Sequence, residues 1–257
     1  MKKLLIILAF VALGALPASA QKLRLMSYNI HNGWGVDGVN SIARIGDVVT
    51  KFAPDVVAVQ EVDSMTRRNK RYLMGVLGEQ TGYHAYFMRT IPHTGGGYGI
   101  GMLSKEKALS VQRIPLPCRS EPRGFLLVEF EKYYFACTHL SLHKANQIES
   151  VAIIRDIITK LDKPVFIAGD LNAKPQSPTM LAFKEFVTVL NDENRNTFNA
   201  NEPQVCIDYV LCYGATPTVL KSYVDYDNRA SDHLPLYVDI QMGKQKKRKK
   251  YNFLQDK

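Results

Sequence analysis

The sequence contains few cysteines: there are four in 257 residues, at positions 118, 137, 206 and 212. So small and scattered a set excludes the disulfide-dense scaffold typical of small secreted domains. Cys206 and Cys212 lie in one apolar run that we expect to be a strand, which would place their Cα atoms roughly 20 Å apart, beyond the reach of a disulfide. Their spacing also differs from that of a metal-binding pair. We therefore expect buried free thiols.

Beyond its first twenty residues the chain also has no apolar run long enough to span a bilayer. At the N-terminus, two lysines precede an apolar stretch over residues 4–16, and residues 18–20 read Ala-Ser-Ala. This pattern is typical of a secretory signal peptide; an uncleaved amphiphilic anchor is the alternative. A lipid anchor is disfavoured because Gln21, not a cysteine, would begin the mature chain. We expect residues 1–20 to be removed and the protein to be exported, to the periplasm or out of the cell.

An excess of positive charge is absent from the body of the chain, although the formal net charge is +9. Two lysines lie in the signal segment, and residues 244–257 hold seven Lys/Arg against one Asp, so removing +2 and +6 leaves about +1 on residues 21–243. A dedicated duplex-DNA binder needs a basic face, and the nearly neutral body argues against that class. We expect residues 244–257 to be a solvated, disordered tail; weak attachment to nucleic acid, an anionic glycan or an acidic lipid surface is the alternative.

About 237 residues follow the signal segment, which suits one large α/β domain over residues 21–243, without a hinge-like linker or a repeat. Apolar periodicity predicts helices over residues 40–52, 70–82, 145–161 and 177–190, the last beginning at Ser177-Pro178. Strands are predicted over residues 23–30, 56–59, 100–103, 125–130, 133–140, 165–168, 205–212 and 234–240. Residues 92–99 contain three consecutive glycines and are expected to form a mobile loop.

Six short polar motifs each stand at the end of an apolar run. They are Ser27-Tyr28-Asn29-Ile30, Gln60-Glu61-Val62, Thr138-His139-Leu140, Gly169-Asp170-Leu171-Asn172-Ala173, Ile207-Asp208-Tyr209 and Ser231-Asp232-His233-Leu234-Pro235. A strand that ends on a carboxylate, amide or imidazole delivers that group to the rim of a sheet. One such ending is usually a cap or a turn. Six of them, with two Asn, one Glu, three Asp and two His, predict a metal-assisted hydrolytic site.

These residue types suit the hydrolysis of a phosphoester. A divalent cation held by oxygen ligands screens the phosphate charge and stabilises the developing oxyanion; magnesium suits such a site, with manganese as the alternative. Glu61 is the best candidate ligand, assisted by Asn29 and Asp232. His233 can take a proton from water near neutral pH, and Asp208 can fix the tautomer of its ring.

Three further residues have candidate roles around the phosphate. Asp170 can orient the attacking water, Asn172 can donate a hydrogen bond in the transition state, and His139 can hold a phosphoryl oxygen. Structural alternatives exist, because Asn29 also suits a turn cap and His139 a core histidine. No folding requirement calls for Glu61, Asp170, Asn172 and His233 together, so the functional interpretation is preferred.

Taken together, the motifs resemble the endonuclease/exonuclease/phosphatase superfamily, which includes pancreatic-type deoxyribonucleases, abasic-site endonucleases, bacterial sphingomyelinases and inositol-polyphosphate phosphatases. The resemblance runs from about Leu23 to Gln241, and the motifs come in the family's order. The Gly-Asp-Leu-Asn-Ala and Ser-Asp-His motifs are highly specific when Gln-Glu precedes them. The resemblance implies an α/β (α+β) four-layer sandwich: two mixed β-sheets packed face to face, helices outside, and the active site at one rim.

The resemblance also implies which residues hold the metal and the substrate. Asn29 and Glu61 match the family's metal-binding pair, and Asp232 matches a neighbouring metal or second-site ligand. Tyr98 and Arg123 fall where relatives often carry residues that face the substrate. No central motif is missing, which argues against an inactive member.

The same resemblance implies the catalytic set. His139 matches the histidine that contacts the scissile phosphate. Asp170 and Asn172 match the pair that positions the nucleophile and the transition state, and Asp208 and His233 match the Asp–His dyad. Either Asp170 or His233 takes the proton of the water, because the two roles are exchangeable across the superfamily.

We therefore expect a monomeric, exported, magnesium-dependent hydrolase of a phosphodiester or phosphomonoester in a small molecule, a nucleic acid or a lipid headgroup. A non-specific or DNA-repair-like endonuclease suits the fold and the tail but not the neutral body. A sphingomyelinase-like enzyme needs an exposed apolar element, and no loop carries clustered Trp, Phe and Leu. A small phosphoester or inositol phosphate suits a compact domain with short loops. A non-enzymatic binding module tethered by the tail is the remaining alternative, which the intact catalytic set disfavours.

Overall fold

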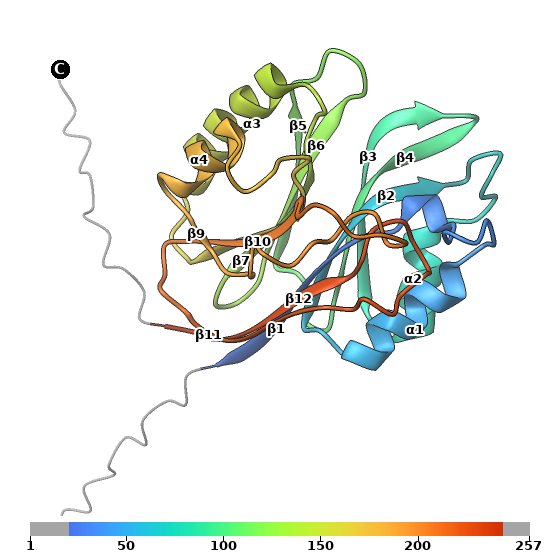
Figure 1. The fold of residues 1–257 in the computed structure, drawn as a ribbon, viewed down its shortest axis with the longest axis horizontal. Coiled ribbons are helices and arrows are strands. Elements are labelled where there is room, and N and C mark those ends of the chain that lie inside the picture. Colours follow the sequence, from blue (N-terminus) through green and yellow to red (C-terminus); the bar gives the residue numbers. More distant parts are fainter. Residues whose placement is uncertain (1–20, 244–257) are drawn as a thin grey trace, which may run out of the picture.

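The computed structural model describes residues 21–243, which form two six-stranded β-sheets packed face to face with helices outside (Figure 1). The first sheet has the order β11 (Thr218–Val224), β12 (Leu236–Gln241), β1 (Lys22–Asn29), β2 (Val56–Ser64), β4 (Gly96–Ser104), β3 (His84–His93). The second has the order β5 (Ser110–Leu116), β6 (Arg123–Glu129), β7 (Tyr134–His139), β8 (Val165–Asp170), β10 (Asp208–Tyr213), β9 (Thr188–Val189). The predicted signal peptide and tail lie outside the described residues.

Both sheets are mixed, because each contains one parallel pair among antiparallel pairs. These pairs are β1 with β2 and β7 with β8. Parallel neighbours need a crossover connection, which α1 (Ile42–Phe52) provides in the first sheet and α3 (Lys144–Ile158) in the second. Two further helices, α2 (Leu73–Thr81) and α4 (Pro178–Lys184), follow β2 and β8 along the chain, and a short 3-10 helix, η1 (His31–Gly33), follows β1.

Three apolar clusters hold the layers together. One fills the space between the sheets, one lies between the first sheet and α1 and α2, and one lies between the second sheet and α3 and α4. The alternation along β1 illustrates the arrangement, because Leu23 and Leu25 belong to the central cluster whereas Met26 and Tyr28 pack toward α1 and α2. The four-layer sandwich predicted from the sequence is thereby confirmed.

The helices follow their sequence signals with one exception. In α1, Ile42, Ile45, Val49 and Phe52 are buried at helical spacing, as predicted. The start of α4 is also as predicted, with its cap Ser177 accepting a hydrogen bond from the third residue of the helix. The predicted length of α4 is wrong, however, because the helix ends at Lys184 and the next residues turn into β9.

Four strands were not predicted from the sequence, β3, β5, β9 and β11, and each is an outermost strand of its sheet. Side chains of an outermost strand are partly exposed, so their apolar alternation is broken; β11 begins with four exposed residues. The mobile loop expected over residues 92–99 is also wrong, because these residues form the end of β3, a tight turn and the start of β4, which pair as a hairpin.

Two other expectations concern the cysteines and membrane spans. Cys118, Cys137 and Cys206 are free thiols, as predicted; Cys137, Cys206 and Cys212 are buried, whereas Cys118 is partly exposed. Within residues 21–243, no helix is both long enough and apolar enough to cross a membrane.

Candidate active site

The ends of three strands, the middle of a fourth and the start of a fifth meet at one rim of the sandwich. In the first sheet Asn29 ends β1 and lies in register with Gln60 of β2; in the second, His139 ends β7 in register with Asp170, the last residue of β8. Parallel strands bring their carboxyl ends to the same edge. β10 runs antiparallel to β8 and begins at Asp208, opposite Asp170. The strand register therefore brings together residues that are far apart in the sequence.

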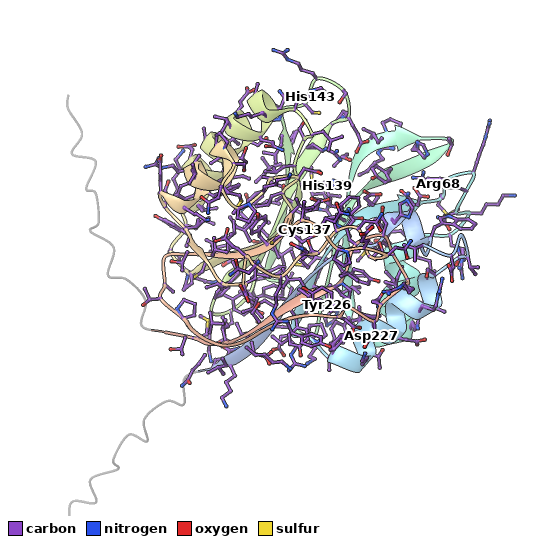
Figure 2. All side chains as sticks on the ribbon, viewed as in Figure 1. Arg68, Cys137, His139, His143, Tyr226 and Asp227 are labelled. Carbon is purple, nitrogen blue, oxygen red and sulfur yellow. The ribbon has the colours of Figure 1, made fainter. Side chains whose placement is uncertain are left out.

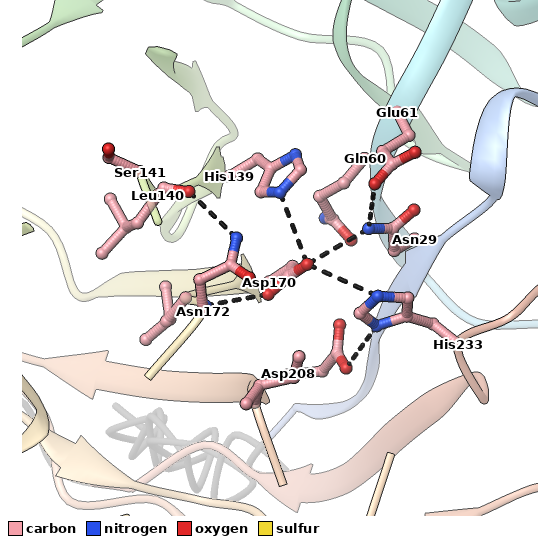
Figure 3. A network of polar contacts seen from close by, with 12 residues as sticks. Asn29, Gln60, Glu61, His139, Leu140, Ser141, Asp170, Asn172, Asp208 and His233 are labelled. Carbon is pink, nitrogen blue, oxygen red and sulfur yellow. Dashed lines mark hydrogen bonds and ion pairs between the residues drawn. The ribbon is translucent and has the colours of Figure 1, made fainter. Parts of the chain in front are cut away.

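Asp170 is the centre of a polar network at this rim (Figure 3). Its Oδ2 atom accepts a hydrogen bond from Asn29 Nδ2 at 3.1 Å. The same oxygen lies 3.4 Å from His139 Nε2 and 3.6 Å from His233 Nε2. Its Oδ1 atom accepts the backbone N–H of Asn172 at 2.8 Å. Asp170 is 1% exposed, so these groups, rather than bulk water, surround its carboxylate.

A second carboxylate orients His233. Asp208 Oδ2 lies 2.9 Å from His233 Nδ1, so the ring donates through Nδ1 and turns Nε2 toward Asp170. The other Asp208 oxygen is buried without a hydrogen-bond partner among the described residues. The Asp208 backbone N–H donates to Thr197 Oγ1 at 3.3 Å, and the ring of Phe198 packs 4.7 Å from that of His233. Sequence reasoning missed Thr197 and Phe198, which lie in a loop without a motif.

Burial and neighbouring charges shift the titration of this cluster. Burial raises the pKa of Asp170 to about 7; the His233 charge opposes the shift and Asp208 adds to it. Burial also disfavours a charged His233, but Asp208 and Asp170 outweigh it and raise its pKa to about 10. Burial, with the charges of Arg123 and His233, lowers the pKa of His139 well below its usual value. Near neutral pH, one charged and one neutral imidazole therefore face a carboxyl group that can exchange a proton.

A β-bulge brings Glu61 to the same rim. The pairing of β2 with β4 shifts between Val59 and Val62, and Glu61 has a φ of 58°. Gln60 is fully buried between the sheets, whereas Glu61 is half-buried and its Oε1 accepts a hydrogen bond from Asn29 Nδ2 at 3.1 Å. The second Glu61 oxygen has no partner among residues 21–243. Bulges commonly redirect one side chain in this way.

Tyr98 of β4 and Arg123 of β6 lie beside the network. Arg123 Nη1 is 3.3 Å from His139 Nδ1 and also pairs with Glu121. Burial raises the pKa of the Tyr98 phenol, and the charges of Glu61 and Glu121 raise it further, so the phenol is neutral. Glu121 was missed by the sequence analysis, since it belongs to no motif.

Asp232 is the predicted residue that stands apart from the network. Its side chain is 28% exposed and its Oδ2 lies 3.9 Å from His31 Nε2. Within residues 21–243 it has no direct contact with Glu61. Its link to the site is Ser231, whose Oγ donates to the carbonyl oxygen of Asn29 at 2.7 Å and contacts Asp232 Oδ1 at 3.4 Å.

Two neighbouring sets of atoms can hold a cation. Asp170, Asp208 and His233 each offer one ligand atom, and these atoms lie within 4.8 Å of one another. Glu61 offers its unpaired oxygen a short distance away, on the other side of Asn29. The Asn29 amide nitrogen faces both Glu61 and Asp170, while its oxygen accepts the backbone N–H of His31 at 3.1 Å. Asn29 thus links the two sets.

This chain resembles a known protein family and several solved structures. A family model described as the endonuclease/exonuclease/phosphatase family matches residues 26–233. A search of curated proteins gives no match.

Among solved structures, an endonuclease/exonuclease/phosphatase from Beutenbergia cavernae DSM 12333 is 24% identical, with a TM-score of 0.74, over 86% of this chain and 72% of that chain. A mannosyl-6-phosphatase from Bacteroides thetaiotaomicron VPI-5482 is 17% identical, with a TM-score of 0.67, over 85% and 99% of the two chains. The human Nocturnin catalytic domain is 17% identical, with a TM-score of 0.62, over 86% and 94%. At these identities the likeness establishes a shared fold.

Proposed function

Since this chain belongs to the endonuclease/exonuclease/phosphatase family, we propose that it is an exported, magnesium-dependent enzyme that hydrolyses a phosphodiester or phosphomonoester by attack of water. The observation that carries the proposal is the convergence of three other segments, through Asn29, His139 and His233, on the buried Asp170 carboxylate. Burying carboxylates close together costs stability. Folding alone does not account for such a cluster, and a reactive site does.

Glu61 is the proposed principal metal ligand, because one of its oxygens is unpaired and it is only half-buried at the rim. Hard oxygen donors suit magnesium, with manganese as the alternative. Asn29 would assist through its amide oxygen and Asp232 through its carboxylate. A cation bound there would screen the phosphate charge and stabilise the leaving oxygen.

Asp170, Asp208 and His233 are assigned to the proton of the attacking water. Asp208 holds the Nδ1 atom of His233, which leaves Nε2 and the Asp170 carboxylate as the two groups that can contact one water. A general base is most effective when its pKa lies near the working pH, and the pKa of Asp170 is about 7. We therefore favour Asp170 as the base and His233 as the group that orients the water and holds the charge.

His139, Asn172 and Arg123 are assigned to the phosphoryl oxygens. Arg123 Nη1 faces His139 Nδ1, so His139 accepts at Nδ1 and carries its proton on Nε2, which faces the centre of the site. Asn172 Nδ2 uses one hydrogen to hold the carbonyl oxygen of Leu140 at 3.1 Å, which fixes the amide and leaves a second hydrogen for a substrate. Fixed donors of this kind stabilise charge that develops in a transition state.

The direct test is turnover of bis-p-nitrophenyl phosphate by the full chain. We expect hydrolysis with magnesium, loss of activity on chelation, and recovery when magnesium is restored. A panel of duplex DNA, RNA, sphingomyelin and inositol phosphates, repeated with the chain ended at Gly243, separates the nuclease, lipid and small-molecule alternatives. Failure to turn over any phosphoester with magnesium or manganese would disprove the proposal. The non-enzymatic binding module would then be the remaining alternative.

The proposed limits of the mature enzyme are a signal peptide at residues 1–20, a monomeric catalytic domain at residues 21–243 and a basic tail at residues 244–257. The Ala-Ser-Ala sequence before Gln21 supports the first limit. Mass spectrometry of protein recovered from periplasm or medium should show a chain that begins at Gln21. A chain that retains the first twenty residues would contradict the proposed export.

A further inference from the structure

A polar pocket of about 180 Å³ opens beside Glu61. Its other lining residues are Asn32, Arg68, Ile91, His93, Tyr98 and Glu121. Figure 2 places Arg68 level with His139 and toward the side of β3 and β4. Pockets for drug-sized ligands span roughly 300–1,000 Å³, so this one suits a single small group. Because Glu61 borders both the pocket and the catalytic network, a group esterified to the phosphate can extend into the pocket.

Arg68 is held rigidly at the wall of this pocket. Its Nε and Nη2 atoms donate to the two oxygens of Asp63 at 2.6 and 2.9 Å, and Nη2 also donates to Asn32 Oδ1 at 2.6 Å. Asp63 is itself buried and held by Thr66 at 3.0 Å, and the Arg68 guanidinium lies 5.6 Å from the centre of the Tyr98 ring. The Nη1 atom has no partner among the described residues, so two N–H groups remain for a ligand.

The pocket presents both hydrogen-bond donors and acceptors without partners. Besides Arg68 Nη1, the imidazole of His93 and the hydroxyl of Tyr98 have no hydrogen-bond partner within residues 21–243. One oxygen of Glu121 is also unpaired in this part of the chain, since this carboxylate uses its other oxygen. A hydroxyl group both donates and accepts, and it matches such a mixed lining better than a purely accepting or purely donating group.

The charges of the pocket argue against an ionic ligand group. Arg68 is already paired with Asp63, and Arg123 with Glu121. Neither positive charge is left over for a second phosphate, and the trimethylammonium group of choline offers no acceptor to the free N–H groups of Arg68. A neutral group with several hydroxyls satisfies the donors and acceptors and faces no unpaired like charge.

We propose that this pocket binds the polyhydroxylated part of a sugar or polyol phosphate, with Arg68 and His93 as its specificity-determining residues. The inference rests on the proposed function, because it places the reacting phosphate at the catalytic network. It adds the identity of the group that carries the phosphate.

The test compares two monoesters with the same ring, glucose 6-phosphate and cyclohexylmethyl phosphate, which lacks the hydroxyls. We expect the wild type to prefer glucose 6-phosphate by at least about tenfold in kcat/KM, since each hydrogen bond to a charged group is worth about one decade or more. Arg68→Met and His93→Phe should each reduce this preference about tenfold. Arg67→Met is the matched control, because Arg67 is exposed and its side chain makes no hydrogen bond or ion pair with the described residues. It should leave the preference unchanged.

Binding to the Asp170→Asn protein, measured by calorimetry, reports on the pocket without turnover and should follow the same order of affinities. Equal kcat/KM for the two esters, with turnover of bis-p-nitrophenyl phosphate intact, would overturn this inference and leave the proposed function standing. A preference for fructose 1,6-bisphosphate or phosphocholine over glucose 6-phosphate would overturn it in favour of an anionic or a cationic ligand group. Absence of turnover with every ester would instead defeat the proposed function, and equal affinities in the calorimeter would then defeat the pocket as well.

Discussion

Replacement of Asp170 by Asn is expected to lower kcat/KM for bis-p-nitrophenyl phosphate by about three orders of magnitude at saturating magnesium, within the range by which a positioned general base contributes. The substitution keeps the size and shape of the side chain and removes only the carboxylate. That carboxylate contacts Asn29, His139 and His233 and has a pKa of about 7. Steady-state kinetics of the purified variant measure the effect.

The stability of the same variant separates a catalytic from a structural role. The folded-state pKa of Asp170 is raised, so its charged form is destabilised in the folded protein at pH values above about 7. Asp170→Asn should therefore melt at or above the wild-type temperature in that range when no metal is added. Asp227→Asn is the matched control, in an exposed loop away from His139 (Figure 2). An Asp170→Asn activity within tenfold of wild type would disprove the assigned role.

His233→Ala extends this experiment. The decrease in kcat/KM should be similar to that of Asp170→Asn, because His233 and Asp170 act on the same proton. Residues that act as a unit have strongly non-additive effects. The kcat/KM of the double variant should therefore be close to that of the less active single variant. A double variant whose loss equals the product of the two single losses would show that the residues act on separate steps.

Replacement of Glu61 by Gln is expected to raise the magnesium concentration for half-maximal activity by about 100-fold or more. Even a residue that only orients a metal ligand costs about 10–100-fold in affinity when it is removed. Glu61 is the proposed direct ligand, and its unpaired oxygen carries the charge that an amide lacks. The measurement is the rate as a function of magnesium concentration at a fixed substrate concentration.

A second readout of metal binding needs no turnover. Ligands that bind only the folded state stabilise it, so magnesium should raise the melting temperature of the wild type and leave that of Glu61→Gln nearly unchanged. Glu79→Gln, an exposed change on α2, is the matched control and should behave as the wild type. An identical magnesium response in Glu61→Gln and wild type would instead indicate that the metal binds at the buried set of Asp170, Asp208 and His233.

The sequence was most informative where an apolar run ended on a polar motif. Such runs form the inner strands of both sheets, whose side chains are buried on both faces and so keep a strong signal. The order of the motifs, set against a known family, then predicted the four layers and the common rim. The roles assigned to Asn29, Glu61, Asp170 and His233 remain predictions.

The remaining features depend on contacts between segments and leave little trace in the sequence. The outermost strands β3, β5 and β11 lack a clear alternation because part of each faces solvent. Phe198 packs on His233, and Arg68 reaches the wall of the pocket, only because loops return to the rim. Asp232 belongs to the same motif as its neighbour His233, yet its side chain is 28% exposed and lies near His31 instead of contacting Asp170.

The pairing of β1 with β12 has a consequence for how the enzyme is made. Among the strands of residues 21–243, β1 is the first to leave the ribosome and its neighbour β12 is the last, with Lys22 opposite Gln241. His233 also precedes β12 by only three residues. A nascent chain therefore contains Asn29 and Glu61 early, but it gains the imidazole of His233 and strand β12 only late in translation. A chain that terminates before β12 therefore cannot carry a finished site.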